Sequence, residues 1–278
     1  MVTRTRRHTG IALGLVVVLL VGLAVGMLAL LQRRLIYLPD SARVPPAGEV
    51  IEGALDVTVR TPDGLALGAW YVPAAPASDL GMAVLVAPGN GGNRSGRAEL
   101  AAELSRRGLA VLLLDYRGYG GNPGSPSEHG LVMDAMSAAH FLEDQGYPAA
   151  RTIYFGESLG TGVVAALQSQ RAPAGMVLRS PFTALADVAA HHYPWLPVRI
   201  LLRDRFEVTS LLSGSEVPVT VIYGDRDSVV PSELSARVAD EATTLVERVV
   251  IPGADHNDAV MFGPQVADAV ARLARAVS

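Results

Sequence analysis

The sequence feature that most restricts the fold of this chain is a serine flanked by glycines, where an apolar strand would end and a helix would begin. Ile153 to Phe155 is apolar, Gly156-Glu157-Ser158-Leu159-Gly160 follows at once, and Val163 to Leu167 has the composition of a helix. Strand, tight turn and helix in this order are typical of a nucleophile elbow, which exposes the serine hydroxyl at the strand tip. The glycines let strand and helix pass closely. Because Gly-x-Ser-x-Gly also arises by chance, the prediction depends on the flanking segments.

From Met82 onwards, short unbroken apolar segments alternate with helical ones. The expected strands are Met82 to Ala87, Leu109 to Leu114, Thr152 to Phe155, Gly175 to Leu178, Val217 to Tyr223 and Leu245 to Ile251. The expected helices are Glu99 to Arg107, Leu131 to Glu143, the elbow helix, Ser232 to Glu241 and Gln265 to Val277. This alternation predicts an α/β fold with a mostly parallel central sheet and helices on both faces. An antiparallel hairpin, Asp56 to Arg60 with Leu65 to Val72, is expected before it.

A serine nucleophile needs a base, and the base needs an acid that orients it. Among the 6 histidines, His256 alone lies in a polar loop after a late expected strand. Two acids, Asp225 and Asp227, follow the preceding strand, and a turn can carry the later carboxylate back over the sheet edge. Asp255 is a poorer candidate, because adjacent side chains rarely face each other in a loop. We therefore predict that Ser158, His256 and Asp227 form a catalytic triad.

The oxyanion of an acyl-transfer intermediate needs two N–H donors. One is expected to be the backbone N–H of Leu159, directly after the nucleophile. The other is expected in the glycine-rich loop after Met82 to Ala87, where we predict the backbone N–H of Asn90, with Gly91 as the fallback. A plain glycine-rich turn without this role is the structural alternative.

Composition narrows the possible partners. The net charge is −4, and no basic patch interleaved with aromatic residues indicates nucleic acid. The chain has no cysteine, which excludes disulfides, thiolate nucleophiles and cysteine-based metal sites. A serine triad needs neither a metal nor a cofactor, so none is expected.

The N-terminal region contains an uncharged apolar run from Gly10 to Leu31. At about 1.5 Å per residue, a helix of this length crosses a hydrocarbon core of about 30 Å. A secretory signal peptide is the alternative, but its apolar region is usually only about 7–15 residues long. We predict a membrane anchor over residues 1–34, a proline-rich linker over 35–49 and a catalytic domain over 50–278. A slight N-terminal excess of arginine favours a catalytic domain outside the cytoplasm.

Several motifs follow one another along the chain, namely Leu85 to Gly96, Asp115 to Glu128, the elbow, Ser180-Pro181-Phe182-Thr183 with His192-Tyr193-Pro194-Trp195, Gly224 to Pro231 and Asp255-His256-Asn257. Together they resemble the membrane-anchored serine α/β-hydrolases of the Bem46 and ABHD13/ABHD17 type. The resemblance implies the α/β-hydrolase fold and the same triad, Ser158, Asp227 and His256. One departure is Pro88, which replaces the usual histidine of the oxyanion loop. The short interval between Ser180 and Val217 predicts a small lid.

The predicted function is a membrane-tethered serine hydrolase that cleaves a carboxylic ester or thioester through an acyl-enzyme. The expected partners are the acyl substrate and the lipid bilayer. A serine peptidase or an acyltransferase on the same triad is the alternative, and an inactive membrane-bound binding module is a third hypothesis. The segment Tyr193 to Val198 has two interpretations, contact with an acyl chain or the membrane and simple packing of a short helix on the core.

Overall fold

The computed structural model describes residues 15–16, 19–20, 22–23, 25–27 and 31–278. Within these residues, no helix has both the length and the apolar character needed to cross a bilayer. The predicted anchor, residues 1–34, lies mostly outside the described residues.

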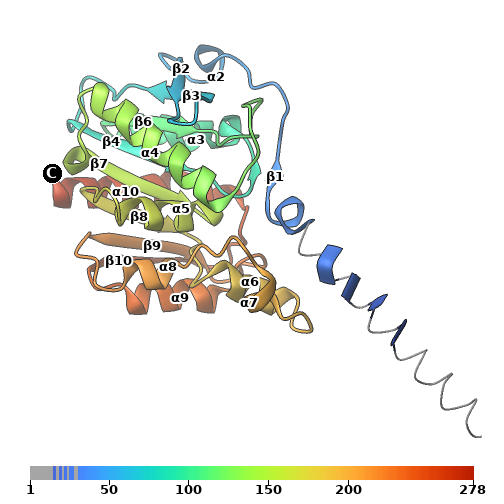
Figure 1. Ribbon diagram of the computed structural model, residues 1–278. Coiled ribbons are helices and arrows are strands. Elements are labelled where there is room, and N and C mark those ends of the chain that lie inside the picture. The colour runs from blue at the N-terminus through green and yellow to red at the C-terminus, as the bar shows by residue number, and fades with distance from the viewer. Residues whose placement is uncertain (1–14, 17–18, 21, 24, 28–30) are drawn as a thin grey trace, which may run out of the picture.

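In the described part of the chain, the centre of the fold is an eight-stranded sheet with the order β10-β9-β8-β7-β4-β6-β3-β2 (Figure 1). Its strands are β2 (Leu55–Arg60), β3 (Ala66–Val72), β4 (Met82–Ala87), β6 (Leu109–Leu114), β7 (Thr152–Glu157), β8 (Gly175–Arg179), β9 (Val219–Gly224) and β10 (Leu245–Ile251). Strands β2 and β3 form the antiparallel hairpin, and β6 to β10 run parallel to β4. Every residue of β4, β6 and β7 is buried, as expected for strands covered on both faces.

Helices cover both faces of this sheet. One face packs against α4 (Glu128–Asp144), α5 (Leu159–Gln168) and α9 (Ser232–Glu241), and the other against α3 (Ala98–Arg106) and α10 (Pro264–Val277). The lid between β8 and β9 consists of α6 (Leu185–His192), α7 (Val198–Leu201) and α8 (Val208–Leu212). The 3₁₀ turns are η1 (Arg94–Arg97), η2 (Ala149–Arg151) and η3 (Ala259–Phe262). The predicted α/β class and the mostly parallel sheet are confirmed.

The predicted boundaries agree with the structure to within a few residues. The largest differences are at α5, which begins at Leu159 rather than at Val163, and at α4, which begins at Glu128 rather than at Leu131. Ser127 explains the earlier start of α4, because its Oγ accepts a hydrogen bond of 3.1 Å from the Gly130 N–H. This bond satisfies one of the first N–H groups of the helix, which have no partner within it.

The segment predicted as a linker is in contact with the domain. Residues 31–36 are helical, and Tyr37, which follows them, is only 2% exposed. Next, β1 (Leu38–Pro39) pairs in parallel with β5 (Gly91–Gly92), and α2 (Ala47–Val50) precedes the hairpin. The chain therefore attaches to the loop after β4 before the main sheet begins.

We predict that Gly160→Ala destabilises the fold by about 1–3 kcal/mol, or more, through overpacking. A Cβ at Gly160 would lie 2.0 Å from the backbone oxygen of Ala87, and neither backbone can move away without disturbing the sheet. Chemical denaturation of the purified full chain measures the change. Gly96→Ala is the matched control, because its Cβ would meet nothing within 4 Å. Equal stabilities for the two variants would contradict the prediction.

Candidate active site

Ser158 occupies a strained turn between β7 and α5. Its φ of 49° and ψ of −116° are unusual for a residue with a side chain, and its N–H donates to the backbone oxygen of Arg179 at 2.8 Å. A Cβ at Gly156 would lie 2.7 Å from the oxygen of Gly160, so this close approach of strand and helix requires glycine. The predicted strand, turn and helix are present, with the serine at the carboxyl end of β7.

The structure brings His256 and Asp227 together. The His256 Nδ1 lies 2.7 Å from Asp227 Oδ2 in a buried contact. Asp227 Oδ1 also accepts hydrogen bonds from the N–H groups of Val229 at 3.0 Å and Val230 at 2.7 Å. Because a carboxylate can only accept, Nδ1 carries the proton and Nε2 is left as the basic nitrogen.

The carboxyl group of Asp227 is held in its charged form. Burial alone would raise its pKa, but the hydrogen bonds from His256 and from the Val230 N–H lower the pKa below its ordinary value overall. A charged Asp227 can orient the imidazole and stabilise the imidazolium during proton transfer.

The two competing acids make other contacts. Asp225 accepts a hydrogen bond of 2.6 Å from the Gly253 N–H. Asp255 accepts from its neighbour's backbone, the His256 N–H, at 2.7 Å and from the Ser228 N–H at 2.7 Å. Asp255 therefore shapes the histidine loop through backbone contacts, and of these three acids only Asp227 bonds to the His256 ring within the described residues.

Ser158 Oγ forms no hydrogen bond with the described residues. Catalytic hydrogen bonds are often long before substrate binds and tighten in the reacting complex. The contact between the serine hydroxyl and the imidazole therefore stays a prediction.

Leu159 and Asn90, the predicted oxyanion donors, line the same cavity as Ser158. Within the described residues, neither backbone N–H donates a hydrogen bond. The loop after β4 packs against the elbow, since a Cβ at Gly89 would lie 3.5 Å from Ser158 Cβ. Two unpaired N–H groups beside a serine can accept the negative charge of an acyl-transfer intermediate. Pro88 stands where the resembling family usually has a histidine. Its backbone oxygen accepts a hydrogen bond of 3.2 Å from the Tyr116 hydroxyl.

A buried charge cluster lies directly behind the serine. The carboxylate of Glu157 accepts two hydrogen bonds from Arg97, at 2.5 and 3.0 Å, and lies 3.0 Å from Arg179 Nη2. Arg179 Nη1 donates to the backbone oxygen of His256 at 2.9 Å, and its guanidinium stacks 4.5 Å from the centre of the Phe262 ring. The cluster therefore connects the elbow to the loop that carries the predicted base.

The charges of the arginines keep Glu157 ionised. Burial opposes ionisation, but the charges of Arg179 and Arg97 and the hydrogen bond from Arg97 lower the pKa of Glu157 to about 2. Sequence reasoning missed this cluster. The available signal was a charged residue at the end of each of two otherwise apolar strands, Glu157 in β7 and Arg179 in β8.

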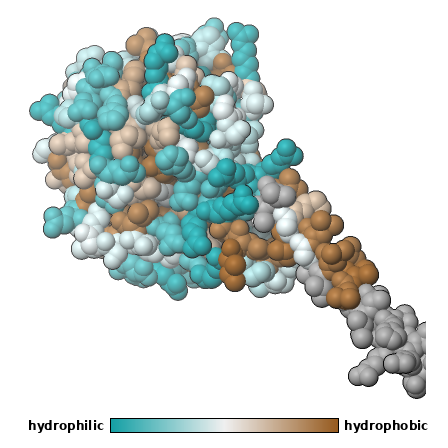
Figure 2. All heavy atoms as spheres, viewed as in Figure 1, coloured by the Kyte–Doolittle hydropathy of each residue, from teal (hydrophilic) through white to brown (hydrophobic). Residues whose placement is uncertain are grey.

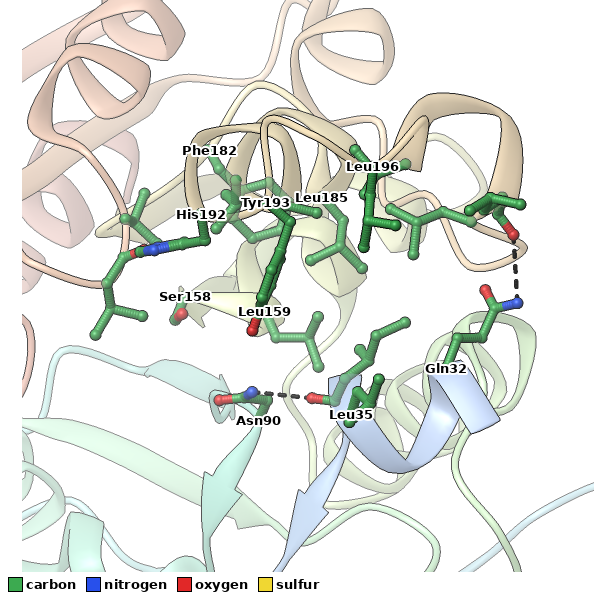
Figure 3. A pocket seen from close by; sticks show the side chains of 18 of the residues that line it. Gln32, Leu35, Asn90, Ser158, Leu159, Phe182, Leu185, His192, Tyr193 and Leu196 are labelled. Carbon is green, nitrogen blue, oxygen red and sulfur yellow. Dashed lines mark hydrogen bonds between the residues drawn. The ribbon is translucent and has the colours of Figure 1, made fainter. Parts of the chain in front are cut away.

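A cavity of about 480 Å³ opens beside Ser158 (Figure 3). Apolar side chains of α6 and α7 form one side, including Leu185, and helical residues 31–36 form the other, including Leu35. Tyr193 and Trp195 also line it, and contact of this segment with an acyl chain stays a hypothesis. Among the described residues, no cluster of three or more His, Asp or Glu side chains could hold a metal ion.

A parallel sheet with a strained serine after a central strand and a His–Asp pair at the same edge defines an α/β-hydrolase. The sequence model of the family described as serine aminopeptidase, S33, matches residues 80–212. The uncharacterized protein Rv2307c of Mycobacterium tuberculosis is 50% identical over 244 residues, which cover 87% of this chain and 86% of that protein. The chain belongs to this S33 family of α/β-hydrolases and is a serine hydrolase.

Two further comparisons describe more distant similarity. The lysophosphatidylserine lipase ABHD12 of Danio rerio is 29% identical over 255 residues, covering 76% of this chain and 66% of that protein. The structure of the Pyrococcus furiosus esterase Pf2001 superposes with a TM-score of 0.68 at 19% identity, covering 87% of this chain and 97% of that one. The structural likeness confirms the fold. The finer resemblance to the Bem46 and ABHD13/ABHD17 type stays a prediction.

We predict that Glu157→Gln destabilises the fold by about 3–5 kcal/mol at neutral pH, because two buried arginines lose their counter-charge. The pKa of Glu157 is about 2 in the folded chain against an ordinary value of 4.5. Its ionisation therefore stabilises the fold above pH 4.5, and this contribution is lost as the pH falls towards 2. Denaturant unfolding across this pH range should show that the difference in free energy of unfolding between wild type and variant decreases as the pH falls.

The matched control is Glu247→Gln, which breaks an exposed ion pair of 2.8 Å with Arg272. Exposed pairs contribute about 0–1 kcal/mol, so this variant should stay close to wild type. If the free energy of unfolding of Glu157→Gln differs little from that of wild type, or if the difference is independent of pH, the buried charge does not stabilise the fold.

Proposed function

We propose that this protein is a membrane-tethered esterase that uses Ser158, His256 and Asp227 as a catalytic triad. The observation that carries the proposal is the buried contact of 2.7 Å between His256 and Asp227, at the sheet edge where the strained Ser158 also lies. A neutral imidazole oriented in this way has a free basic nitrogen, which a serine nucleophile requires.

In the proposed mechanism, Ser158 Oγ attacks the carbonyl carbon of the ester while its proton passes to His256 Nε2. The N–H groups of Leu159 and Asn90 stabilise the oxyanion of the tetrahedral intermediate. Collapse of this intermediate breaks the bond to the alcohol oxygen, which takes the proton from Nε2. Water then attacks the acyl-enzyme, gives a proton to Nε2 and releases the carboxylic acid, and the proton returns to Ser158.

The cavity favours an ester or thioester over a peptide substrate. Its described lining has no Asp or Glu side chain, whereas an aminopeptidase needs an anionic group to bind the substrate's terminal ammonium. The names of two similar proteins, an esterase and a lysophospholipid lipase, support acyl ester chemistry. A serine peptidase or acyltransferase on the same triad is the competing function.

Tethering to the membrane is part of the proposal. It is supported by the sequence of the apolar run Gly10 to Leu31, and by the exposure of its described residues, such as Leu15 at 65% and Leu19 at 73%. Apolar residues gather where the described residues of this N-terminal region meet the domain (Figure 2). Exposed apolar surface of this kind marks contact with a membrane or partner. The excess of arginine before the run favours a catalytic domain outside the cytoplasm.

We predict that the full chain hydrolyses p-nitrophenyl butyrate and is labelled by a fluorophosphonate, and that Ser158→Ala abolishes both. Asp227→Asn should lower kcat by about 10³–10⁴-fold, because the imidazole would lose its oriented, charged partner. Steady-state kinetics of the purified protein in detergent measure both effects.

Asp225→Asn is the matched control, because this acid follows the same strand without touching the ring. Its kcat should stay within about threefold of wild type, a change of less than 1 kcal/mol. Folded wild type that neither turns over the ester nor reacts with the probe would refute the enzyme mechanism, and equal effects of the two Asp variants would refute the choice of acid.

A separate prediction concerns the membrane. Wild type should sediment with membranes, resist extraction by alkaline carbonate and dissolve in detergent, because burial of an apolar helix in lipid is effectively irreversible. A cell-impermeant fluorophosphonate applied to intact cells and to lysate tests the side of the membrane. Labelling in intact cells supports the extracytoplasmic placement, and release of the protein by carbonate would contradict tethering.

A further inference from the structure

The cavity beside Ser158 extends away from the serine along an apolar path (Figure 3). Ser158 lies towards one side of the view and Gln32 towards the other, with Leu159, Leu185 and Leu196 between them. Polar lining groups occur towards the serine in this view, at Asn90, His192 and the Tyr193 hydroxyl, and at the opposite side, at Gln32. The volume of about 480 Å³ is in the range of pockets that bury a small ligand.

Residues 31–36, which we term the N-terminal wall, contribute one side of this cavity. Gln32, Leu35 and Ile36 are its lining residues. The wall begins at Leu31, the last residue of the apolar run Gly10 to Leu31. Its position therefore links the proposed membrane tether to the substrate cavity.

Hydrogen bonds fix the N-terminal wall to the chain after α7. Gln32 donates to the Leu201 oxygen at 3.3 Å and accepts from the Arg203 N–H at 2.8 Å. Arg33 donates two bonds to Asp204, at 3.0 and 3.2 Å, and the buried Tyr37 hydroxyl donates to the same carboxylate at 2.9 Å. Asp204 is only 5% exposed and its bond to Tyr37 is buried, whereas the Arg33 side chain is half exposed. The charge-assisted bonds therefore hold a buried carboxylate from the protein surface.

A second set of bonds joins the N-terminal wall to the predicted oxyanion loop. The side chain of Asn90 donates to the Ile36 oxygen at 2.9 Å. The backbone oxygen of Asn90 accepts hydrogen bonds from the Leu38 N–H and from the Tyr119 hydroxyl, both at 3.0 Å. These contacts leave the Asn90 N–H unpaired within the described residues, beside the serine.

We propose that this cavity binds the single unbranched acyl chain of the substrate, and that the N-terminal wall is a specificity-determining part of the site. The inference rests on the proposed esterase function, which places the substrate carbonyl at Ser158. The apolar path then receives the methylene groups of the acyl chain, which gain affinity through burial in proportion to their area. The chain segment that leads to the membrane is thus also a wall of the acyl site.

The test compares acyl chain lengths in the full protein. Wild type should have a kcat/KM for p-nitrophenyl laurate at least about tenfold above that for the acetate, since each methylene bound in such a pocket changes discrimination severalfold. Leu35→Trp, which fills the cavity from the N-terminal wall, should lower the laurate-to-acetate ratio at least about tenfold. Ala189→Trp should do the same from α6, the opposite side.

Arg34→Trp is the matched control, because Arg34 is exposed on the same helical turn and does not line the cavity. Its laurate-to-acetate ratio should equal that of wild type. An unchanged ratio in Leu35→Trp, or equal changes of the ratio in Leu35→Trp and Arg34→Trp, would overturn the role of the N-terminal wall. A wild type that hydrolyses both esters equally well would overturn the acyl site and leave the esterase function standing.

Binding of dansyl-labelled undecanoic acid to Ser158→Ala provides a readout that is independent of catalysis. Adding Leu35→Trp should raise its Kd at least about tenfold, whereas adding Arg34→Trp should not. This pattern without any ester turnover in wild type would support the acyl site and refute the proposed function. Failure of the fatty acid to bind would overturn the acyl site, whatever the activity.

Discussion

The buried charge of Glu157 is the interaction on which the geometry of the site depends. Removing an ion from water costs several kcal/mol, and only well-placed partners offset this cost. Here the partners are Arg97 from η1 and Arg179 from the end of β8. Since Arg179 also donates to the backbone of His256, one ionic cluster fixes the relative positions of the elbow and the histidine loop, which are far apart in sequence.

The strained conformation of Ser158 also depends on Arg179. A positive φ at a non-glycine residue costs about 1–3 kcal/mol and persists only where the surroundings enforce it. At Ser158, the enforcing contacts are the close approach of Gly156 to Gly160 and the bond from the Ser158 N–H to the Arg179 oxygen. The backbone of Arg179 therefore holds the serine, and its side chain holds the histidine loop.

The sequence could predict the fold and much of the site because their signals are local. Unbroken apolar strands, the elbow, and the order of serine, Asp227 and His256 can all be recognised within short segments, and the contact between His256 and Asp227 agrees with the preference for the later acid. Two features could not be predicted in this way. The Glu157 cluster needs side chains from three separate elements. The N-terminal wall was missed because residues 31–34 were assigned to the membrane anchor and residues 35–36 to a linker, on account of the prolines that follow them.

These prolines place a compositional boundary near residue 50, but the contacts extend the substrate cavity back to Gln32. Between these points, Ile36 and Leu38 bond to Asn90, and Tyr37 bonds to Asp204, which lies between α7 and α8 of the lid. On the proposed function, a chain that begins at residue 50 would lack one wall of the acyl site and the support of the oxyanion loop. On this proposal, the segment before the hairpin belongs to the catalytic unit rather than to a spacer, because it supplies one wall of the cavity and bonds to the predicted oxyanion loop.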